Sequence, residues 1–331
     1  MTEKKPQLLQ LLADGEWHSG QEMADRLEIS RAAVWKQLES LKRQLGLDLH
    51  AVRGRGYRLP RPLELLDEKL IRTRMSERGQ GLVSTIEIHE TIDSTSSHLM
   101  SQPAEALRTG HVCLAERQTA GRGRRGRQWV SPFAGSVYLS LYWRYTLSPA
   151  ELSGVSLAAG LAVVRGLEQL GIQGVGLKWP NDILHQHRKL AGLLLEVSGE
   201  QSGPSRVVLG LGLNVSMPPS EAGAIDQPWI DLESLPGGKA ISRNHLVAVL
   251  LDSLVQILSD FESGGLARLV DEWRRYDLYH GEPVMLRMGD RLVEGIHRGI
   301  DPSGALLLET ESGIQLHHGG EVSLRPAGRK D

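Results

Sequence analysis

The chain contains very little cysteine: Cys113 is the only one among 331 residues. A single cysteine excludes an intramolecular disulfide and a cysteine-based zinc cluster. Because Cys113 lies in an apolar run, residues 111–115, we interpret it as a buried strand residue rather than a reactive thiol. No apolar run approaches the roughly 18 residues that cross a bilayer. The first six residues, MTEKKP, lack the apolar stretch of a signal peptide. We therefore expect a cytoplasmic protein without membrane contact.

The charge of the chain is close to neutral, with a formal value of −2. Bulk charge therefore does not indicate a nucleic-acid-binding protein. The charge is uneven, however, because residues 1–61 contain eleven Lys or Arg and eight Asp or Glu. This mild basic bias is compatible with DNA binding at the amino terminus. A chain of this length can form two or three domains with their own cores.

One short segment concentrates unusual chemistry. Residues 121–127 contain three glycines and four arginines; we call this segment the Gly/Arg loop. Glycine lets the backbone approach a ligand closely, and arginine provides a planar charged fork for carboxylate or phosphate oxygens. The loop is therefore suited to close over a small anion. A flexible basic surface loop is the alternative interpretation.

The first 65 residues predict a winged helix-turn-helix. Leu8, Leu11 and Leu12 recur at helical spacing, and Ser19 with Glu22 forms a capping box before a second helix. A third helix begins after Ser30, and residues 47–52 and 57–59 predict the two strands of a wing. Trp35 lies off the apolar stripe, where it either packs on DNA or covers the wing. The predicted DNA-binding residues are Ser30, Arg31, Ala32, Trp35, Lys36, Arg53 and Arg55. A winged helix used only for packing or protein contacts is the alternative.

Two later segments carry a resemblance. They are LKWPNDI at residues 177–183 and RKLAGLLLE at residues 188–196. Together with the Gly/Arg loop, and in this order, they resemble the signatures of biotin–protein ligases. With the amino-terminal domain, nearly the whole chain resembles the bifunctional bacterial form, which is both ligase and biotin operon repressor.

The resemblance implies a set of site residues. The turn before residue 96 is similar to the family's biotin-contacting motif, with Ser96 where asparagine is usual. We expect Arg127 to be a solvated flank, and His185 and His187 to belong to a solvated turn. The residues implied for catalysis are Arg122, Arg124, Lys178 and Lys189. Those implied for biotin binding are Ser94, Thr95, Ser96, Gln118, Arg122, Gly123, Arg124 and Lys189. Those implied for adenylate or ATP binding are Arg125, Trp129, Asn181, Asp182, Asn214 and Trp229.

Several of these residues also have simpler interpretations. Ser94 or Thr95 could be a helix N-cap, and Asp182 a turn-capping carboxylate. Asn214 could be a satisfied amide at a strand end, and Trp229 could be an ordinary core residue. Asn181 or Asp182 could instead hold Mg²⁺ or orient a lysine. We expect no metal site of the protein's own, because Mg²⁺ would arrive with ATP, with Asp182 as its possible protein ligand.

The expected architecture is α+β with three domains: residues 1–65, 66–275 and 276–331. The resemblance implies that the central domain is a mixed α/β ligase core related to class II aminoacyl-tRNA synthetases. It also implies an SH3-like β barrel at the carboxyl terminus, to which Glu321 and Arg325 could add ligand contacts. The expected core strands are 82–89, 112–116, 137–143, 174–177, 190–197 and 207–215. The expected helices are 152–170, 245–261 and 266–273, with a loop at 216–228. The expected barrel strands are 283–288, 292–300, 305–309, 314–317 and 322–324.

The function implied by the resemblance has two half-reactions. Biotin and MgATP give biotinoyl-5′-adenylate, and a lysine of biotin carboxyl carrier protein then takes the biotin. The adenylate would also be the co-repressor of a homodimer that binds biotin operator DNA. The alternatives are a monofunctional ligase whose winged helix does not repress, a ligand-sensing repressor without catalysis, and a lipoate ligase of related fold.

Overall fold

Capping residues fix where the amino-terminal helices begin. The side chain of Ser19 accepts a hydrogen bond from the Glu22 amide, and that of Ser30 from the Ala33 amide. A two-stranded antiparallel hairpin completes the winged helix, although its first strand begins at His50 rather than at residue 47. The elements are α1 (Lys5–Leu12), α2 (Gly20–Leu27), α3 (Arg31–Leu45), β1 (His50–Val52) and β2 (Gly56–Arg58).

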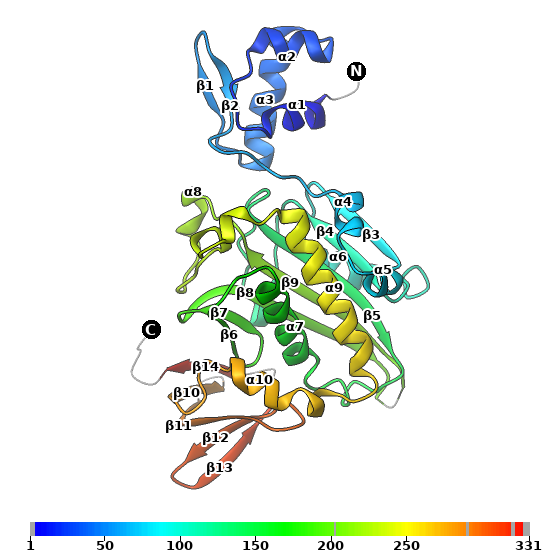
Figure 1. Cartoon of the computed structure of the whole chain (residues 1–331), viewed down its shortest axis with the longest axis vertical. Helices are drawn as coiled ribbons and strands as arrows, with labels where there is room; N and C mark the ends of the chain where they lie inside the picture. The colour runs from blue at the N-terminus through cyan, green and yellow to red at the C-terminus, as the bar shows by residue number, and fades with distance from the viewer. Residues whose placement is uncertain (1–3, 202, 289–290, 319–321, 327–331) are drawn as a thin grey trace.

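This computed structural model describes residues 4–201, 203–288, 291–318 and 322–326. The molecule is elongated, with the winged helix at one end, the large mixed sheet in the middle and the last strands at the other end (Figure 1). Glu321 lies outside the described residues, and of Arg325 only the backbone position in a strand is described.

A seven-stranded sheet forms the central domain. Its order is β3-β4-β5-β9-β8-β7-β6, and only the β3–β4 pair is parallel. The strands are β3 (Thr85–His89), β4 (His111–Ala115), β5 (Ser136–Tyr145), β6 (Val175–Lys178), β7 (Asp182–His185), β8 (Arg188–Gly199) and β9 (Ser205–Asn214).

The two faces of this sheet differ because side chains alternate along each strand. On β9, Leu209 and Leu211 belong to the main apolar core, whereas Gly210 and Gly212 point to the other face. Helices α7 (Val155–Gln169) and α9 (Arg243–Phe261) cover the apolar face (Figure 1). Helix α6 (Thr95–Ser101) lies on the glycine face. A Cβ added at Gly210 would lie only 2.6 Å from the Ser96 hydroxyl oxygen, so the helix packs closely there.

Helix α9 has the length and apolar character of a bilayer-spanning segment. However, 67% of its 18-residue window is buried inside the protein. It is thus a central core helix that packs against α7.

Several boundaries differ from expectation. The strand expected from residue 82 begins at Thr85, because the preceding residues form α4 (Glu68–Thr73) and α5 (Glu77–Leu82). Asp67 and Ser76 cap these helices by accepting hydrogen bonds from backbone amides. The apolar pattern of the sequence did not indicate either helix. The expected 216–228 loop contains one helical turn, α8 (Pro219–Ala222), and the helix expected at 266–273 is a 3-10 turn followed by α10 (Val270–Tyr276).

The carboxy-terminal strands form one antiparallel sheet in the order β13-β12-β11-β10-β14. The described pairings join all five strands into the small β domain that the sequence predicted, and a register shift between His297 and Ile300 interrupts the β11–β12 pairing. Its strands are β10 (Pro283–Met288), β11 (Arg291–Ile300), β12 (Leu306–Thr310), β13 (Gly313–His317) and β14 (Val322–Pro326).

The winged helix is packed against the central domain. Its apolar cluster, which includes Leu38 and Leu45, also contains Phe133 and Ala134 from the segment that follows the Gly/Arg loop. The Arg117 guanidinium donates a hydrogen bond to the Gln44 carbonyl.

Candidate active site

A cavity of about 1050 Å³ opens on the glycine face of the central sheet; we call it the main cavity. The Gly/Arg loop, the turn at residues 178–182 and strands β8 and β9 contribute to its walls. Six cationic side chains line it, against only two carboxylates, Asp182 and Asp226. The cations are Arg122, Arg124, Arg125, Arg127, Lys178 and Lys189. This imbalance favours an anionic ligand.

The Gly/Arg loop is a folded hairpin over this cavity. The Gly123 amide donates to the Arg127 carbonyl at 2.7 Å, and the Trp129 amide donates to the Gly121 carbonyl at 2.8 Å. A 3-10 turn, residues 124–126, forms its tip. There the φ angles of Arg125 and Gly126 are +59° and +73°. A positive φ costs glycine little, so Gly126 permits the reversal.

Trp129 packs directly on the glycines of the sheet. A Cβ added at Gly212 would lie 2.5 Å from Trp129 Cε2, and one at Gly192 would lie 3.3 Å from Trp129 Cζ3. The absence of a side chain at Gly212 is therefore required for the indole to lie this close to β9, and Gly192 also leaves it room on β8. The indole in turn forms part of the cavity floor.

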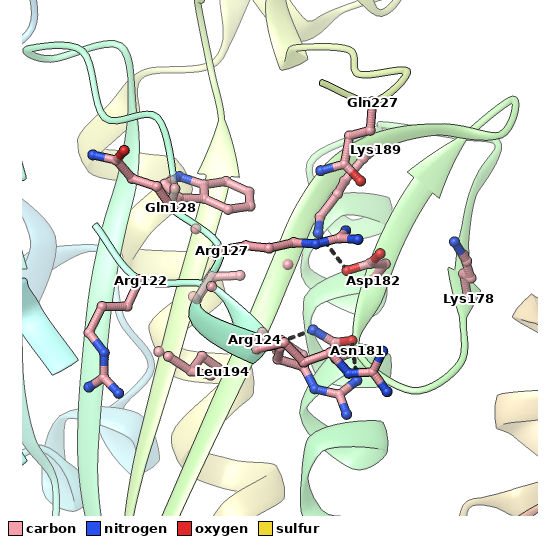
Figure 2. Close-up of a pocket in the computed structure, with 18 of the residues that line it drawn as sticks. Arg122, Arg124, Arg127, Gln128, Lys178, Asn181, Asp182, Lys189, Leu194 and Gln227 are labelled. Carbon is pink, nitrogen blue, oxygen red and sulfur yellow. Dashed lines mark hydrogen bonds and ion pairs between the residues drawn. The ribbon is translucent and has the colours of Figure 1, made fainter. Parts of the chain in front are cut away.

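Arg122 is paired in this conformation. Its two terminal nitrogens lie 3.0 and 2.8 Å from the two carboxylate oxygens of Glu196 on β8. Figure 2 shows its guanidinium directed away from Lys189 and Asp182. Because Glu196 compensates its charge, Arg122 here attaches the loop to the sheet.

Arg124 bridges the loop to the turn at residues 178–182. Its Nη1 donates to Asn181 Oδ1 at 3.0 Å, and Asn181 Nδ2 donates to the Leu193 carbonyl at 2.7 Å (Figure 2). Burial lowers the pKa of Arg124, and Asp182 opposes this effect. A partly desolvated guanidinium interacts more strongly with a nearby anion than one in bulk water.

Lys189 and Asp182 form the central ion pair of the cavity. Lys189 Nζ lies 2.7 Å from Asp182 Oδ1, and each side chain is less than one-fifth exposed. The ammonium also lies 5.5 Å from the centre of the Trp129 ring, within cation–π range. Lys178 Nζ lies 5.9 Å from the ring of Tyr279, in the segment that leads into the small β domain.

The predicted biotin-contacting turn is part of a buried hydroxyl network. Ser94 is the N-cap of α6, which is the simpler of the two interpretations given above. Gln118 Oε1 accepts from the Thr95 amide at 2.9 Å, and the hydroxyls of Thr95 and Ser96 lie 2.8 and 2.9 Å from Ser140 Oγ. Ser94, Thr95, Ser96 and Gln118 all line the main cavity.

Two predicted adenylate-binding residues do not line the cavity. The buried Asn214 side chain donates to the backbone carbonyls of Lys189 and Ile230, as a satisfied strand-end amide does. The backbone of Trp229 pairs with Lys189, and its half-buried indole lies outside the lining.

The cavity also contains residues that the sequence did not single out as ligand contacts. Arg127, expected to be a solvated flank, extends toward Lys189 and Asp182 (Figure 2). His187, expected in a solvated turn, is exposed and yet lines the cavity. The other additional lining residues include Gln128, Gln227 and Tyr279. Gln128 directly follows the loop, but no local signal marks Gln227 or Tyr279.

The predicted DNA-binding residues are exposed on α3 and on the wing. Ser30 caps α3, and Trp35 is 57% exposed, so it does not cover the wing. Arg53 lies at the turn between β1 and β2, and the Arg55 guanidinium lies 4.9 Å from the Trp17 ring centre. Arg31, Ala32 and Lys36 follow on α3.

The fold and the cavity define a protein with a helix-turn-helix module joined to a ligase-type α/β domain. The family models that match are an HTH domain at residues 4–58, the biotin/lipoate A/B protein ligase family at 88–214 and the biotin protein ligase C-terminal domain at 279–325.

Relatives extend this match to nearly the whole chain. The bifunctional ligase/repressor BirA of Salmonella typhimurium is 43% identical and that of Escherichia coli K12 is 42% identical, each over 97% of this chain and 97% of its own length. The biotin protein ligase of Aquifex aeolicus, solved with biotin and ATP, superposes with a TM-score of 0.63 at 30% identity, covering 74% of this chain and all of that one. The chain belongs to the biotin–protein ligase family, in its bifunctional ligase/repressor branch, and the resemblance is confirmed.

Proposed function

We propose that this protein joins biotin to ATP as biotinoyl-5′-adenylate and transfers the biotin to a lysine of biotin carboxyl carrier protein. One observation carries the proposal: a cavity of about 1050 Å³ lined by six cations and closed by a glycine-rich loop. Ligand pockets usually measure about 300–1,000 Å³, so this volume is sufficient for two substrates held together.

The first half-reaction joins two anions. A carboxylate oxygen of biotin attacks the α-phosphorus of ATP, the bond to the bridging oxygen breaks, and pyrophosphate leaves. Lys189 and Arg124 neutralise the charge that would otherwise keep the two groups apart. Lys178 and Arg125 add positive charge from the cavity walls, and the indole of Trp129 offers a flat surface to the adenylate. Gln118 and the turn at residues 94–96 position biotin.

The second half-reaction needs no covalent enzyme intermediate. The only cysteine of the chain is buried outside the main cavity. The acceptor lysine nitrogen attacks the carbonyl of the mixed anhydride directly, and AMP leaves with the electron pair of the broken bond. The carrier protein therefore has to reach the open side of the cavity.

Mg²⁺ enters this scheme as part of the substrate MgATP. The one carboxylate considered as a ligand, Asp182, is already ion-paired with Lys189 at 2.7 Å. Its position fits the orientation of that lysine better than the coordination of a hard cation, which prefers several oxygen ligands. We assign no step to a protein-held magnesium ion.

The winged helix adds a regulatory function to the ligase. We infer that the adenylate-bound homodimer binds biotin operator DNA through the amino-terminal end of α3 and through Arg53 and Arg55. Adenylate would accumulate when acceptor lysines are scarce and would then favour repression. This activity belongs in the cytoplasm, where ATP, carrier protein and DNA are all present. We also propose that residues 1–65, 66–275 and 276–331 form three separate domains.

Labelled biotin and a purified carrier domain provide the test. Wild-type protein should release pyrophosphate and label one carrier lysine. Lys189→Ala should lose most of this activity, whereas Lys239→Ala, which changes an exposed lysine, should keep it. A pure ligand sensor would release no pyrophosphate, and a lipoate ligase would prefer lipoate when the two acids compete.

The repressor function requires a separate test. A gel shift with a biotin operon fragment should show binding that needs biotin and ATP together. Arg53→Ala should weaken it and reduce the slope of log K against log salt by about 0.9 if it contacts one phosphate. A monofunctional ligase would shift no fragment under either condition.

A further inference from the structure

A second group of chemically reactive side chains lies outside the main cavity. Glu87 and His89 on β3, His98 on α6 and Cys113 on β4 bring their potential ligand atoms within 4.8 Å of one another. We call these four residues the β3–β4 cluster. His111 lies beside it, with its Nε2 3.4 Å from Glu87 Oε1. None of the five residues lines the main cavity.

The strand register explains why these residues meet. Strands β3 and β4 are parallel neighbours, and Glu87 is the register partner of Cys113. Alternate residues on a strand share a face, so His89 joins Glu87, and His111 joins Cys113, on the same side of the sheet. Helix α6 covers that side and places His98 Nε2 3.0 Å from Glu87 Oε1.

The hydrogen bonding of the group is incomplete. Three imidazoles share one carboxylate: His98 Nε2 and His111 Nε2 approach Glu87 Oε1, and His89 Nε2 approaches Glu87 Oε2, all within ion-pair distance. None of these contacts has the geometry of a hydrogen bond, so the buried atoms Glu87 Oε1, His89 Nε2 and His111 Nε2 lack one among the described residues. Buried polar atoms in native proteins are nearly always satisfied. Several potential metal-ligand atoms that converge on one point without hydrogen bonds match the arrangement around a bound cation.

We propose that Glu87, His89, His98 and Cys113 bind a divalent transition-metal ion of the zinc class, with His111 as an alternative ligand. Imidazole nitrogen, thiolate sulfur and a carboxylate oxygen together form a donor set that suits Zn²⁺ or Co²⁺ and disfavours Mg²⁺ or Ca²⁺. The lone cysteine excludes a cysteine-rich zinc cluster but not this mixed set.

The distances are close to those that a tetrahedral ion requires. Metal–ligand bonds of roughly 2.1 Å place neighbouring ligand atoms roughly 3.4 Å apart. His98 Nε2 lies 3.0 Å from Glu87 Oε1, and His89 Nε2 lies 3.5 Å from Glu87 Oε2. The four ligand atoms lie within 4.8 Å of one another, so the side chains must move inward to bind one ion.

Burial gives the cluster an open and a closed side. The side chains of His89, Glu87 and His98 are 32%, 28% and 24% exposed, so an ion can enter from solvent. Cys113 is fully buried at the base of the cluster. A bound cation would hold its sulfur as the thiolate, because a coordinating thiol is deprotonated.

Cobalt substitution tests the site in the full-length protein. After treatment with a chelator, titration with Co²⁺ alone should give one equivalent of binding, visible d–d bands of a tetrahedral site and a near-ultraviolet thiolate-to-cobalt band. Zn²⁺ should displace the colour, and excess Mg²⁺ should not. His98→Gln should weaken Co²⁺ binding by more than about tenfold, since the loss of a mere supporting group already costs about that much.

Two further variants separate ligation from folding. Cys113→Ser should abolish the thiolate band, and His89→Gln, which changes a partly exposed residue, should weaken binding as His98→Gln does. His245→Gln, which changes an exposed histidine at the start of α9, is the matched control and should bind Co²⁺ as the wild type does. The proposal is overturned if wild-type protein gives no tetrahedral spectrum, or if folded His98→Gln and His245→Gln bind Co²⁺ equally.

Discussion

Arg124→Ala removes the hydrogen bond that connects the Gly/Arg loop to Asn181, measured at 3.0 Å. A hydrogen bond from a charged group contributes about 1.5–3 kcal/mol. At about 1.36 kcal/mol per factor of ten, its loss shifts the loop toward an open state by about 10- to 150-fold. If the loop retains the adenylate, the rate of adenylate release should rise by a similar factor.

The assay forms labelled adenylate in a single turnover and then adds excess unlabelled biotin and ATP. Arg124→Ala should lose the label faster and should biotinylate lysines of a bystander protein, because released adenylate reacts without selection. Arg206→Ala, which changes an exposed arginine on β9 outside the cavity, is the control. Normal retention and normal carrier transfer by Arg124→Ala would falsify the role assigned to this residue.

Three other substitutions test the surrounding structure. Gly212→Ala places a methyl group against the Trp129 indole, so urea unfolding should show an overpacking loss of about 1–3 kcal/mol. The displaced indole should also raise the KM for ATP in a pyrophosphate-release assay, and an unchanged KM would contradict the placement of the adenylate on Trp129. Glu116→Ala leaves Arg243 buried without its ion-pair partner, so urea unfolding should show a loss of about 3–5 kcal/mol, and a loss below about 1 kcal/mol would refute the importance of the pair. Although burial raises the pKa of Glu64, hydrogen bonds from Ser242, Asn244 and the Arg243 amide outweigh it and lower the pKa below the ordinary 4.5. The stability from Glu64 is therefore present above about pH 4.5 and lost as the pH falls through the lowered folded-state pKa. Glu64→Gln should show a shallower fall of unfolding free energy in this acid window, and an identical pH profile would count against the assignment.

Much of the fold could be predicted because its signals are local. Ser19 and Ser30 start two helices of the winged domain through the side-chain caps that their positions suggested. The alternating apolar residues of β5 and β9 marked central strands. The short helices α4 and α5 were missed because six-residue helices carry too few apolar positions to show a period.

The candidate site was only partly visible in the sequence. Residues of continuous motifs, such as Arg124 and Lys189, line the cavity as expected. Tyr279 and Gln227 reach the same cavity from distant segments, and only the tertiary structure brings them there. The β3–β4 cluster depends on the parallel register that places Glu87 opposite Cys113, which no spacing within either segment reveals.

The position of Phe133 has a consequence for how the protein can be dissected. Its ring lies in the apolar cluster of the winged helix, only four residues after Trp129 on the cavity floor. Truncation of the first 65 residues would leave Phe133 and Ala134 facing water and would loosen the segment that leads back to the indole. A shortened chain should therefore differ from the intact one in substrate affinity as well as in DNA binding, so truncation cannot cleanly separate the two activities.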